Sequence, residues 1–259
     1  MSLMQNLYDC HVHLNMTQFD SFRDSLIEEC AKCLDFCINV GYNEKSSEES
    51  LLLAYKHPFI KAAVGLHPSY ASQADQRFLD RLSKMLLEEE VAALGEIGLD
   101  YYWMKAPPDI QKKVFTEQME LAAQHKKPVI IHDRESHKDT IDILKAFRGR
   151  VRGVLHSFSG DRKMAHTAME MGYYLSLSGP VTYQNKKNIP FREMIATLPA
   201  ERLLIETDSP YLAPVPFRGK TNTPLNVSYV AREIASLIKM DLQEFLELSR
   251  AGARKLFGI

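Results

Sequence analysis

The sequence predicts an α/β domain, a (β/α)₈ barrel of the TIM type with an extra helix at its carboxyl end, and three observations lead to this prediction. The chain has 259 residues, close to the ~250 residues typical of one closed parallel barrel. Eight short runs of apolar, often β-branched residues indicate eight strands. Segments with helical periodicity separate these runs. Such alternation predicts either a closed barrel or an open doubly wound sheet, and the length and the number of units favour closure.

The expected strands follow one another with room for a helix after each. Their ranges are 7–14, 36–41, 61–66, 91–99, 128–132, 153–156, 173–178 and 203–206. Pro58, Pro128 and Pro199 stand shortly before three of these strands, where proline helps to end the preceding helix. Apolar residues recur at helical spacing in 110–125 and after His137. The same spacing in 242–257 predicts the extra terminal helix, which we expect to pack on the outside of the barrel.

Composition is that of an ordinary globular protein, with 45% hydrophobic and 25% charged residues. The sequence has no run of ~18 apolar residues that would span a bilayer, and no cationic leader with a cleavage site. We therefore expect a soluble, cytoplasmic protein with one domain over residues 1–259, in which Met1, Ser2 and Leu3 are an added leader before Met4. The net charge of −1 gives no general attraction to nucleic acid, so any site for a polyanion must be local.

The chain has four cysteines, Cys10, Cys30, Cys33 and Cys37. Cys30 and Cys33 have the Cys-x-x-Cys spacing, but no second Cys or His pair follows at the distance of a zinc finger. We interpret all of them as reduced thiols without a metal or redox role.

Residues that can bind metal ions gather near the carboxyl ends of the expected strands. They are His11, His13, Glu96, His132, His156 and Asp208. In a barrel these ends form one rim, so residues far apart in the sequence converge there. His11 and His13 are two positions apart on a strand, and both side chains can therefore point to the same face. Four imidazoles and two carboxylates suit Zn²⁺ or Mn²⁺ and exceed what one tetrahedral catalytic ion needs, which predicts two metals.

The other histidines fall in helical or connecting segments, and most of them are expected to be surface or capping residues. This interpretation applies to His57, His125, His137 and His166.

Five blocks of the sequence resemble signatures of the TatD family of deoxyribonucleases, and the match runs from the first strand to the last helix. The blocks are Asp9-Cys-His-Val-His13, Gly95-Glu-Ile-Gly-Leu-Asp100-Tyr-Tyr102, Pro128-Val-Ile-Ile-His132, His156-Ser-Phe-Ser-Gly160 and Glu206-Thr-Asp-Ser-Pro-Tyr-Leu-Ala-Pro214. The His-x-His block is shared with the wider amidohydrolase superfamily. The last block, together with Arg218-Gly-Lys220, is specific.

The resemblance implies a function and a set of metal ligands. One divalent ion would be held by His11, His13, Glu96 and Asp208, and the other by Glu96, His132 and His156. Glu96 would bridge two ions, Zn²⁺, Mn²⁺ or Mg²⁺, and a water activated by both would hydrolyse phosphodiester bonds of DNA. The resemblance suggests no stable protein partner and no membrane. The sequence departs from the family pattern at Ser69, where His is frequent, and at Thr223, where Glu is frequent.

Further roles follow with less support from the motifs. Asp208 is expected to orient the water and accept its proton. Strand alternation places Glu206, two positions earlier, on the same face as Asp208, where we expect it either to hydrogen-bond a ligand from behind or to form a plain buried ion pair. Candidates for substrate contacts are His67, Arg134, Arg218 and Lys220. The aromatic residues Tyr101, Tyr102 and Trp103 follow the fourth strand and could stack on bases.

Two other functions stay open at this point. One is hydrolysis of another ester by the same chemistry, such as deacylation of aminoacyl-tRNA, and the other is metal binding without turnover. A doubly wound nucleotide-binding fold is disfavoured, because no Gly-x-Gly-x-x-Gly or Gly-x-x-x-x-Gly-Lys-Ser/Thr block follows any expected strand.

Overall fold

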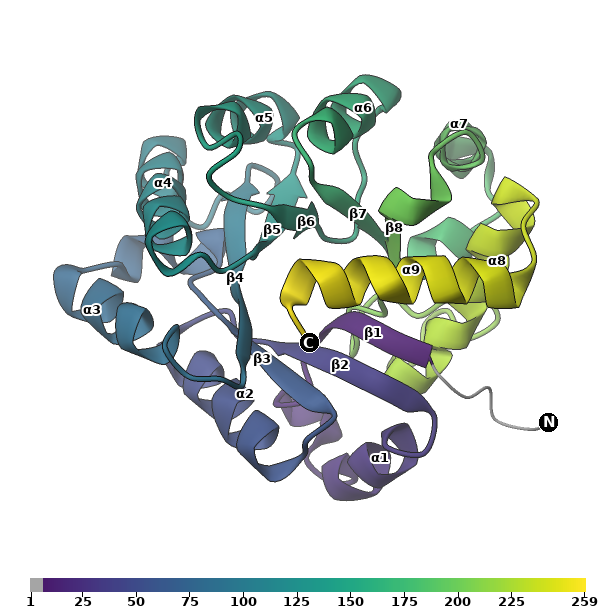
Figure 1. The fold of residues 1–259 in the computed structure, drawn as a ribbon, viewed down its shortest axis with the longest axis horizontal. Helices are drawn as coiled ribbons and strands as arrows, with labels where there is room; N and C mark the ends of the chain where they lie inside the picture. The colour runs from purple at the N-terminus through teal and green to yellow at the C-terminus, as the bar shows by residue number, and fades with distance from the viewer. Residues whose placement is uncertain (1–6) are drawn as a thin grey trace.

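The computed structural model describes residues 7–259. Eight parallel strands form a nearly closed barrel in which each strand pairs with the next in sequence order, and helices surround it (Figure 1). The strands are β1 (Leu7–Val12), β2 (Leu34–Val40), β3 (Ile60–Val64), β4 (Val91–Asp100), β5 (Val129–Arg134), β6 (Gly153–Leu155), β7 (Tyr174–Leu177) and β8 (Leu203–Ile205). The predicted (β/α)₈ barrel is confirmed, and each expected strand is present within about two residues of its predicted ends. The leader expected at residues 1–3 lies outside the described residues.

Helices follow each strand. They are α1 (Arg23–Cys30), α2 (Glu44–Lys56), α3 (Gln76–Met85), α4 (Pro108–His125), α5 (His137–Ala146), α6 (Arg162–Glu170), α7 (Ile189–Ile195), α8 (Val227–Ile238) and α9 (Leu242–Phe257). Asn43, Asp75, Asp161 and Asp241 begin four of them, each accepting a hydrogen bond from a backbone N–H of the first turn. In the stretch of chain that the structure describes, no helix combines the length and apolar character needed to span a membrane.

The terminal helix α9 has the bounds that the sequence predicts, and it lies across the barrel beside β1 and β8 (Figure 1). Ser249 donates to the carbonyl of Leu203, the first residue of β8, at 2.7 Å. Arg254 forms a bidentate ion pair with Asp35 near the start of β2. These contacts fall at the amino-terminal ends of the strands, so α9 covers the end of the barrel opposite to the one where the predicted ligands lie.

The barrel closes between its first and last strands, β1 and β8, only at their carboxyl ends. Asp208 donates its N–H to the carbonyl of His11, and His13 donates its N–H to the carbonyl of Ser209, both at 2.9 Å. Asp9 reinforces this closure, because one of its carboxylate oxygens accepts the N–H of His11 at 3.1 Å and the N–H of Thr207 at 3.0 Å. The two strand ends that carry predicted ligands are therefore held together by backbone contacts.

Candidate metal centre

The carboxyl ends of the strands open into a cavity of about 1180 Å³. Five of the six predicted ligands line it, namely His13, Glu96, His132, His156 and Asp208. His11 is fully buried, and its ring stacks on that of His156 with 4.0 Å between centroids. The structure thus brings all six residues together at one end of the barrel.

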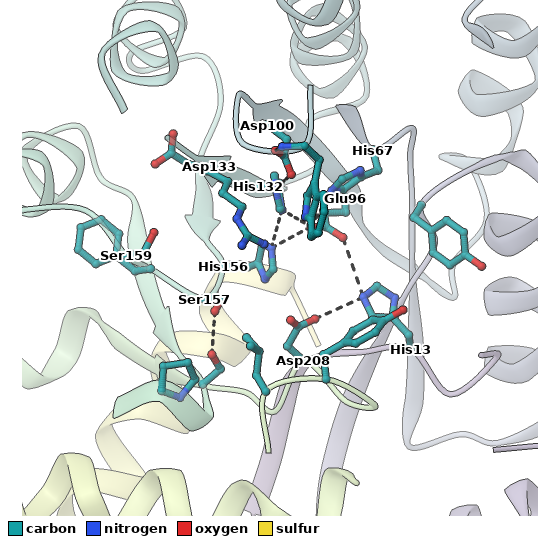
Figure 2. Close-up of a pocket in the computed structure, with 18 of the residues that line it drawn as sticks. His13, His67, Glu96, Asp100, His132, Asp133, His156, Ser157, Ser159 and Asp208 are labelled. Carbon is teal, nitrogen blue, oxygen red and sulfur yellow. Dashed lines mark hydrogen bonds and ion pairs between the residues drawn. The ribbon is translucent and has the colours of Figure 1, made fainter. Parts of the chain in front are cut away.

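Glu96 lies between the pair His11 and His13 and the pair His132 and His156, and Figure 2 shows it beside His13, His132 and His156. Its Oε2 atom is 3.7 Å from His11 Nε2 and 3.9 Å from His13 Nε2. Its Oε1 atom is 2.8 Å from both His132 Nδ1 and His156 Nε2. The single carboxylate of Glu96 therefore faces both histidine pairs, each with a different oxygen.

Asp208 completes the first of these groups. Its Oδ1 atom is 3.7 Å from His11 Nε2 and 3.5 Å from His13 Nε2. Its backbone has a positive φ of 54°, and its side chain is 13% exposed where that of Glu96 is 6% exposed. Asp208 thus faces both the imidazoles and the open cavity.

The hydrogen bond of His13 indicates which of its ring nitrogens carries the proton. His13 Nδ1 lies 2.8 Å from the carbonyl of Val40, so it is the donor and the Nε2 lone pair faces Glu96 and Asp208. His132 has a carboxylate oxygen at each ring nitrogen, with Asp100 Oδ2 3.1 Å from Nε2 and Glu96 Oε1 2.8 Å from Nδ1. Both nitrogens donate when the ring is protonated, and when only Nε2 donates the Nδ1 lone pair faces Glu96.

The lone pair of His132 Nδ1 and Glu96 Oε1 are both acceptors, and the two atoms are 2.8 Å apart. A positive charge has to lie between them, either a proton in the free protein or a metal ion. Neutral imidazole and carboxylate are also the donor set that divalent transition metals prefer. The residues present therefore fit a divalent ion in each group.

The electrostatics of the centre favour a bound cation in the same way. Burial alone would raise the pKa of Glu96, but the charge of His156 and the hydrogen bonds from His132 and His156 outweigh it and hold the pKa well below its usual range. Burial alone would lower the pKa of His156, but the carboxylates of Glu96 and Glu206 hold it well above. The pKa of His11 is well below its usual range, because burial and the neighbouring His156 both disfavour the imidazolium. The centre holds buried negative charge that positive charge must balance.

Gly98 allows β4 and β5 to approach each other beside the centre. Its φ is 140°, and a Cβ atom there would lie 2.0 Å from the carbonyl oxygen of His132. Only glycine fits this position without moving the backbone that carries a predicted ligand.

Glu206 lies behind His156 and is fully buried. Its Oε1 atom accepts the N–H of Ser157 at 2.7 Å and is 3.5 Å from His156 Nδ1. Strand β8 ends at Ile205 and the backbone of Asp208 is left-handed, so strand alternation does not extend from Glu206 to Asp208. The carboxylate of Glu206 supports a histidine from the neighbouring part of the rim.

The predicted substrate contacts are distributed over two regions. His67 and Arg134 line the cavity, and His67 Nε2 is 3.7 Å from Glu96 Oε1. Arg218 packs its guanidinium over the ring of Tyr183, 4.3 Å from the centroid. Among the described residues, those that line the cavity include neither Arg218 nor Lys220.

Two buried carboxylates beside the centre, Asp9 and Asp100, were not predicted as site residues. Asp9 holds β1 against the segment before Asp208, and Asp100 contacts His132. Both occur within the quoted motifs. The signal in the sequence was a carboxylate in a strand expected to be buried, which burial disfavours unless the carboxylate has partners. The four cysteines, which we interpreted from the sequence as reduced thiols, are free, and all of them are buried.

Comparisons with known proteins give matches over nearly the whole chain. The model of the family described as TatD related DNase matches residues 8–258. An uncharacterized metal-dependent hydrolase of Bacillus subtilis, YabD, is 40% identical over 98% of this chain and 99% of its own length. Another from Escherichia coli, YcfH, is 34% identical over 98% of this chain and 96% of its own. The crystal structure of YjjV, a TatD homologue from Escherichia coli, superposes with a TM-score of 0.91 at 28% identity, covering 98% of both chains.

Proposed function

The chain belongs to the TatD-related DNase family of metal-dependent hydrolases, and from that premise we propose that it is a deoxyribonuclease that uses two divalent ions to hydrolyse phosphodiester bonds. The observation that carries the proposal is the position of Glu96, whose two oxygens face different pairs of histidines. His11, His13, Glu96 and Asp208 would hold one ion, and Glu96, His132 and His156 the other. When bound, such ions polarise a phosphoryl group and make water nucleophilic at neutral pH.

Asp208 orients the attacking water and takes its proton. Its carboxylate contacts both His11 and His13 through one oxygen. Its side chain also borders the cavity, where the substrate has to enter. A carboxylate in this position can accept a hydrogen bond from water while it remains part of the ligand set.

His67 donates a hydrogen bond to the substrate. Its Nδ1 atom accepts the N–H of Ser69 at 3.1 Å, so the proton of the neutral ring is on Nε2, which points toward Glu96. Burial lowers the pKa of His67 to about 3, so the ring is neutral at physiological pH. A neutral N–H beside the centre can bind a nonbridging phosphate oxygen without adding a further cation. The contact that fixes His67 comes from the backbone N–H of Ser69, so it does not depend on the side chain at position 69.

The cationic side chains of the cavity support a phosphodiester as the substrate. Arg134, Lys105 and Lys187 all line it, and a guanidinium can bind phosphate through paired hydrogen bonds. Arg218 and Lys220 would contact a longer strand where it leaves the cavity.

Metal analysis of the purified protein, combined with assays on single-stranded DNA, duplex DNA and aminoacyl-tRNA, tests the proposal. We expect two equivalents of divalent metal and release of nucleotides from DNA that stops when a chelator is added. Release of free amino acid from aminoacyl-tRNA with intact DNA would replace the deoxyribonuclease by a deacylase. Bound metal with no hydrolysis of any of the three substrates would reject catalysis on these classes.

A further inference from the structure

Two exposed aromatic rings and one arginine form a cluster at the edge of the cavity. Tyr102 is 51% and Trp103 57% exposed, and their rings meet edge to face with 4.9 Å between centroids. The guanidinium carbon of Arg134 lies 4.2 Å from the centroid of Tyr102 and 5.6 Å from that of Trp103. Within residues 7–259, Arg134 forms no ion pair with a carboxylate. We call these three residues the aromatic platform.

The platform is built on the same two strands as the candidate metal centre. In the β4–β5 ladder Gly98 pairs with His132 and Asp100 pairs with Arg134, and Tyr101 continues the ladder by donating its N–H to the Arg134 carbonyl at 2.9 Å. Trp103 and Arg134 line the cavity that also contains Glu96 and His132. The platform therefore has a fixed position relative to the centre, because Arg134 lies only two positions after His132 on β5.

We propose that the aromatic platform binds an unpaired nucleobase of the substrate strand, next to the phosphodiester at the metal centre, and that Asp100 fixes the platform relative to His132. This inference rests on the proposed function. Every base has a π face that can stack on an aromatic ring, and arginine adds a cation–π contact together with attraction to the backbone phosphate. Single exposed rings are common on protein surfaces, whereas a contiguous exposed cluster, here Tyr102 and Trp103 in contact with each other, is typical of an interaction site. Inside a duplex the neighbouring base pairs stack on both faces of each base, so we expect the occupant to be an unpaired, unstacked base of a single strand.

Asp100 joins the platform to the predicted ligand through its two carboxylate oxygens. Oδ2 lies 3.1 Å from His132 Nε2. Oδ1 accepts the N–H of Tyr102 at 3.0 Å and the N–H of Trp103 at 2.8 Å. A carboxylate behind a ligating histidine fixes its ring orientation and raises its affinity for metal. Here the same carboxylate also fixes the backbone of the platform, which makes Asp100 a positioning residue for both.

Trp103 is the only tryptophan in the chain, so intrinsic fluorescence reports directly on the platform. The first experiment titrates the metal-loaded protein with a short single-stranded phosphorothioate oligothymidylate, and separately with an abasic strand of equal length and charge. We expect quenching of Trp103 by the base-containing strand and binding about tenfold tighter than that of the abasic strand. Tyr102→Ala should remove most of this difference. Tyr55→Ala, which removes an equally exposed ring (51%) from α2 outside the cavity, should retain it.

The second experiment measures affinity for Zn²⁺ by chelator competition, without substrate. Asp100→Asn keeps the shape of the side chain. We expect it to lower the affinity for the more weakly bound of the two Zn²⁺ ions by about 10- to 100-fold. It should also reduce the preference for the base-containing strand. Tyr102→Ala should leave Zn²⁺ affinity unchanged. Wild-type Zn²⁺ affinity in Asp100→Asn would overturn the role of Asp100.

The results separate this inference from the proposed function. If the wild-type protein hydrolyses DNA but binds both strands equally, or if Tyr102→Ala keeps the preference, the platform is not a base site and the deoxyribonuclease stands. If the wild-type protein neither hydrolyses nor binds DNA, both proposals fail. Hydrolysis together with a base preference that depends on Tyr102 supports both.

Discussion

The carboxylate of Glu96 has a geometry that few substitutions can reproduce. Each oxygen faces a different pair of imidazoles, at 3.7 and 3.9 Å on one side and 2.8 Å on the other. Aspartate would be one methylene shorter, and glutamine would replace one acceptor by an NH₂ donor. A bridging role therefore depends on both the charge and the length of this one side chain.

Glu96→Gln keeps the length of the side chain and removes its charge, so we expect loss of at least one metal equivalent. We expect the rate of DNA hydrolysis to fall by at least about 100-fold, because loss of a residue that only supports a ligand already lowers activity by up to about 100-fold. Metal content by elemental analysis and the rate measured on one preparation test this. Glu117→Gln on the surface of α4 is the matched control and should behave as the wild type. Unchanged metal content and rate in Glu96→Gln would remove Glu96 from the bridging role.

Asp208 and Arg134 should affect different kinetic constants. Asp208→Asn leaves the substrate contacts in place and removes the group that orients water, so it should mainly lower kcat. Arg134→Ala should mainly raise KM, and it should flatten the slope of log affinity against log salt by about one unit, because one phosphate contact is lost. Steady-state kinetics on an oligonucleotide at several salt concentrations measures both effects. A fall in kcat with unchanged KM in Arg134→Ala would contradict the assignment, and Arg218→Ala tests the same expectation for longer strands.

Single residues also differ in how far the sequence could predict them. His11, His13, His132 and His156 were predictable as a group, because side chains that follow parallel strands of a barrel share one rim. The roles of Asp9 and Asp100 were not, because each depends on a hydrogen bond to another strand or loop whose register the sequence does not give.

At the scale of elements, the strands were predictable because fully buried parallel strands read as continuous apolar runs. The ends of the strands were less predictable from the sequence. The strand expected at 203–206 ends at Ile205, and Asp208 then adopts a left-handed backbone, which the rule of alternating side chains does not anticipate. The bounds of α9 followed from helical spacing, but the end of the barrel that it covers depends on contacts such as Ser249 with Leu203 and Arg254 with Asp35.

The packing of α9 predicts a loss of stability without a change at the metal centre. Phe245 is fully buried in the core, and Phe245→Ala should lower the free energy of unfolding by about 3–5 kcal/mol. Leu248 on the same helix is 39% exposed, so Leu248→Ala should cost much less. Urea unfolding of both variants measures the difference. Equal destabilisation by the two substitutions would mean that α9 is not packed against the barrel in solution as described.

At the scale of the whole molecule, the two ends of the barrel differ in kind. The amino-terminal end carries α9 and apolar packing, which contribute to stability. The carboxyl-terminal end concentrates buried carboxylates and imidazoles around Glu96, and burial of charge without a counterion is unfavourable. This division is typical of enzymes with this fold, and it has a consequence for the stability of the metal-free protein.

Because the proposed ligands converge only in the folded chain, bound ions should stabilise the whole domain by mass action. At a free Mn²⁺ concentration about 100 times the Kd the stabilisation is about 2.7 kcal/mol for each bound ion, which for a domain of this size corresponds to a rise in Tm of about 5–10 °C per ion. Mn²⁺ is preferable to Zn²⁺ for this test, because the four cysteines of the unfolded chain bind Zn²⁺ and would reduce the effect. Thermal unfolding with excess chelator and with Mn²⁺ measures the shift. Glu96→Gln should lose most of it, whereas Phe245→Ala should unfold at a lower temperature yet retain the full shift. An equal Tm with and without Mn²⁺ in the wild-type protein would contradict metal binding by the folded chain at these concentrations.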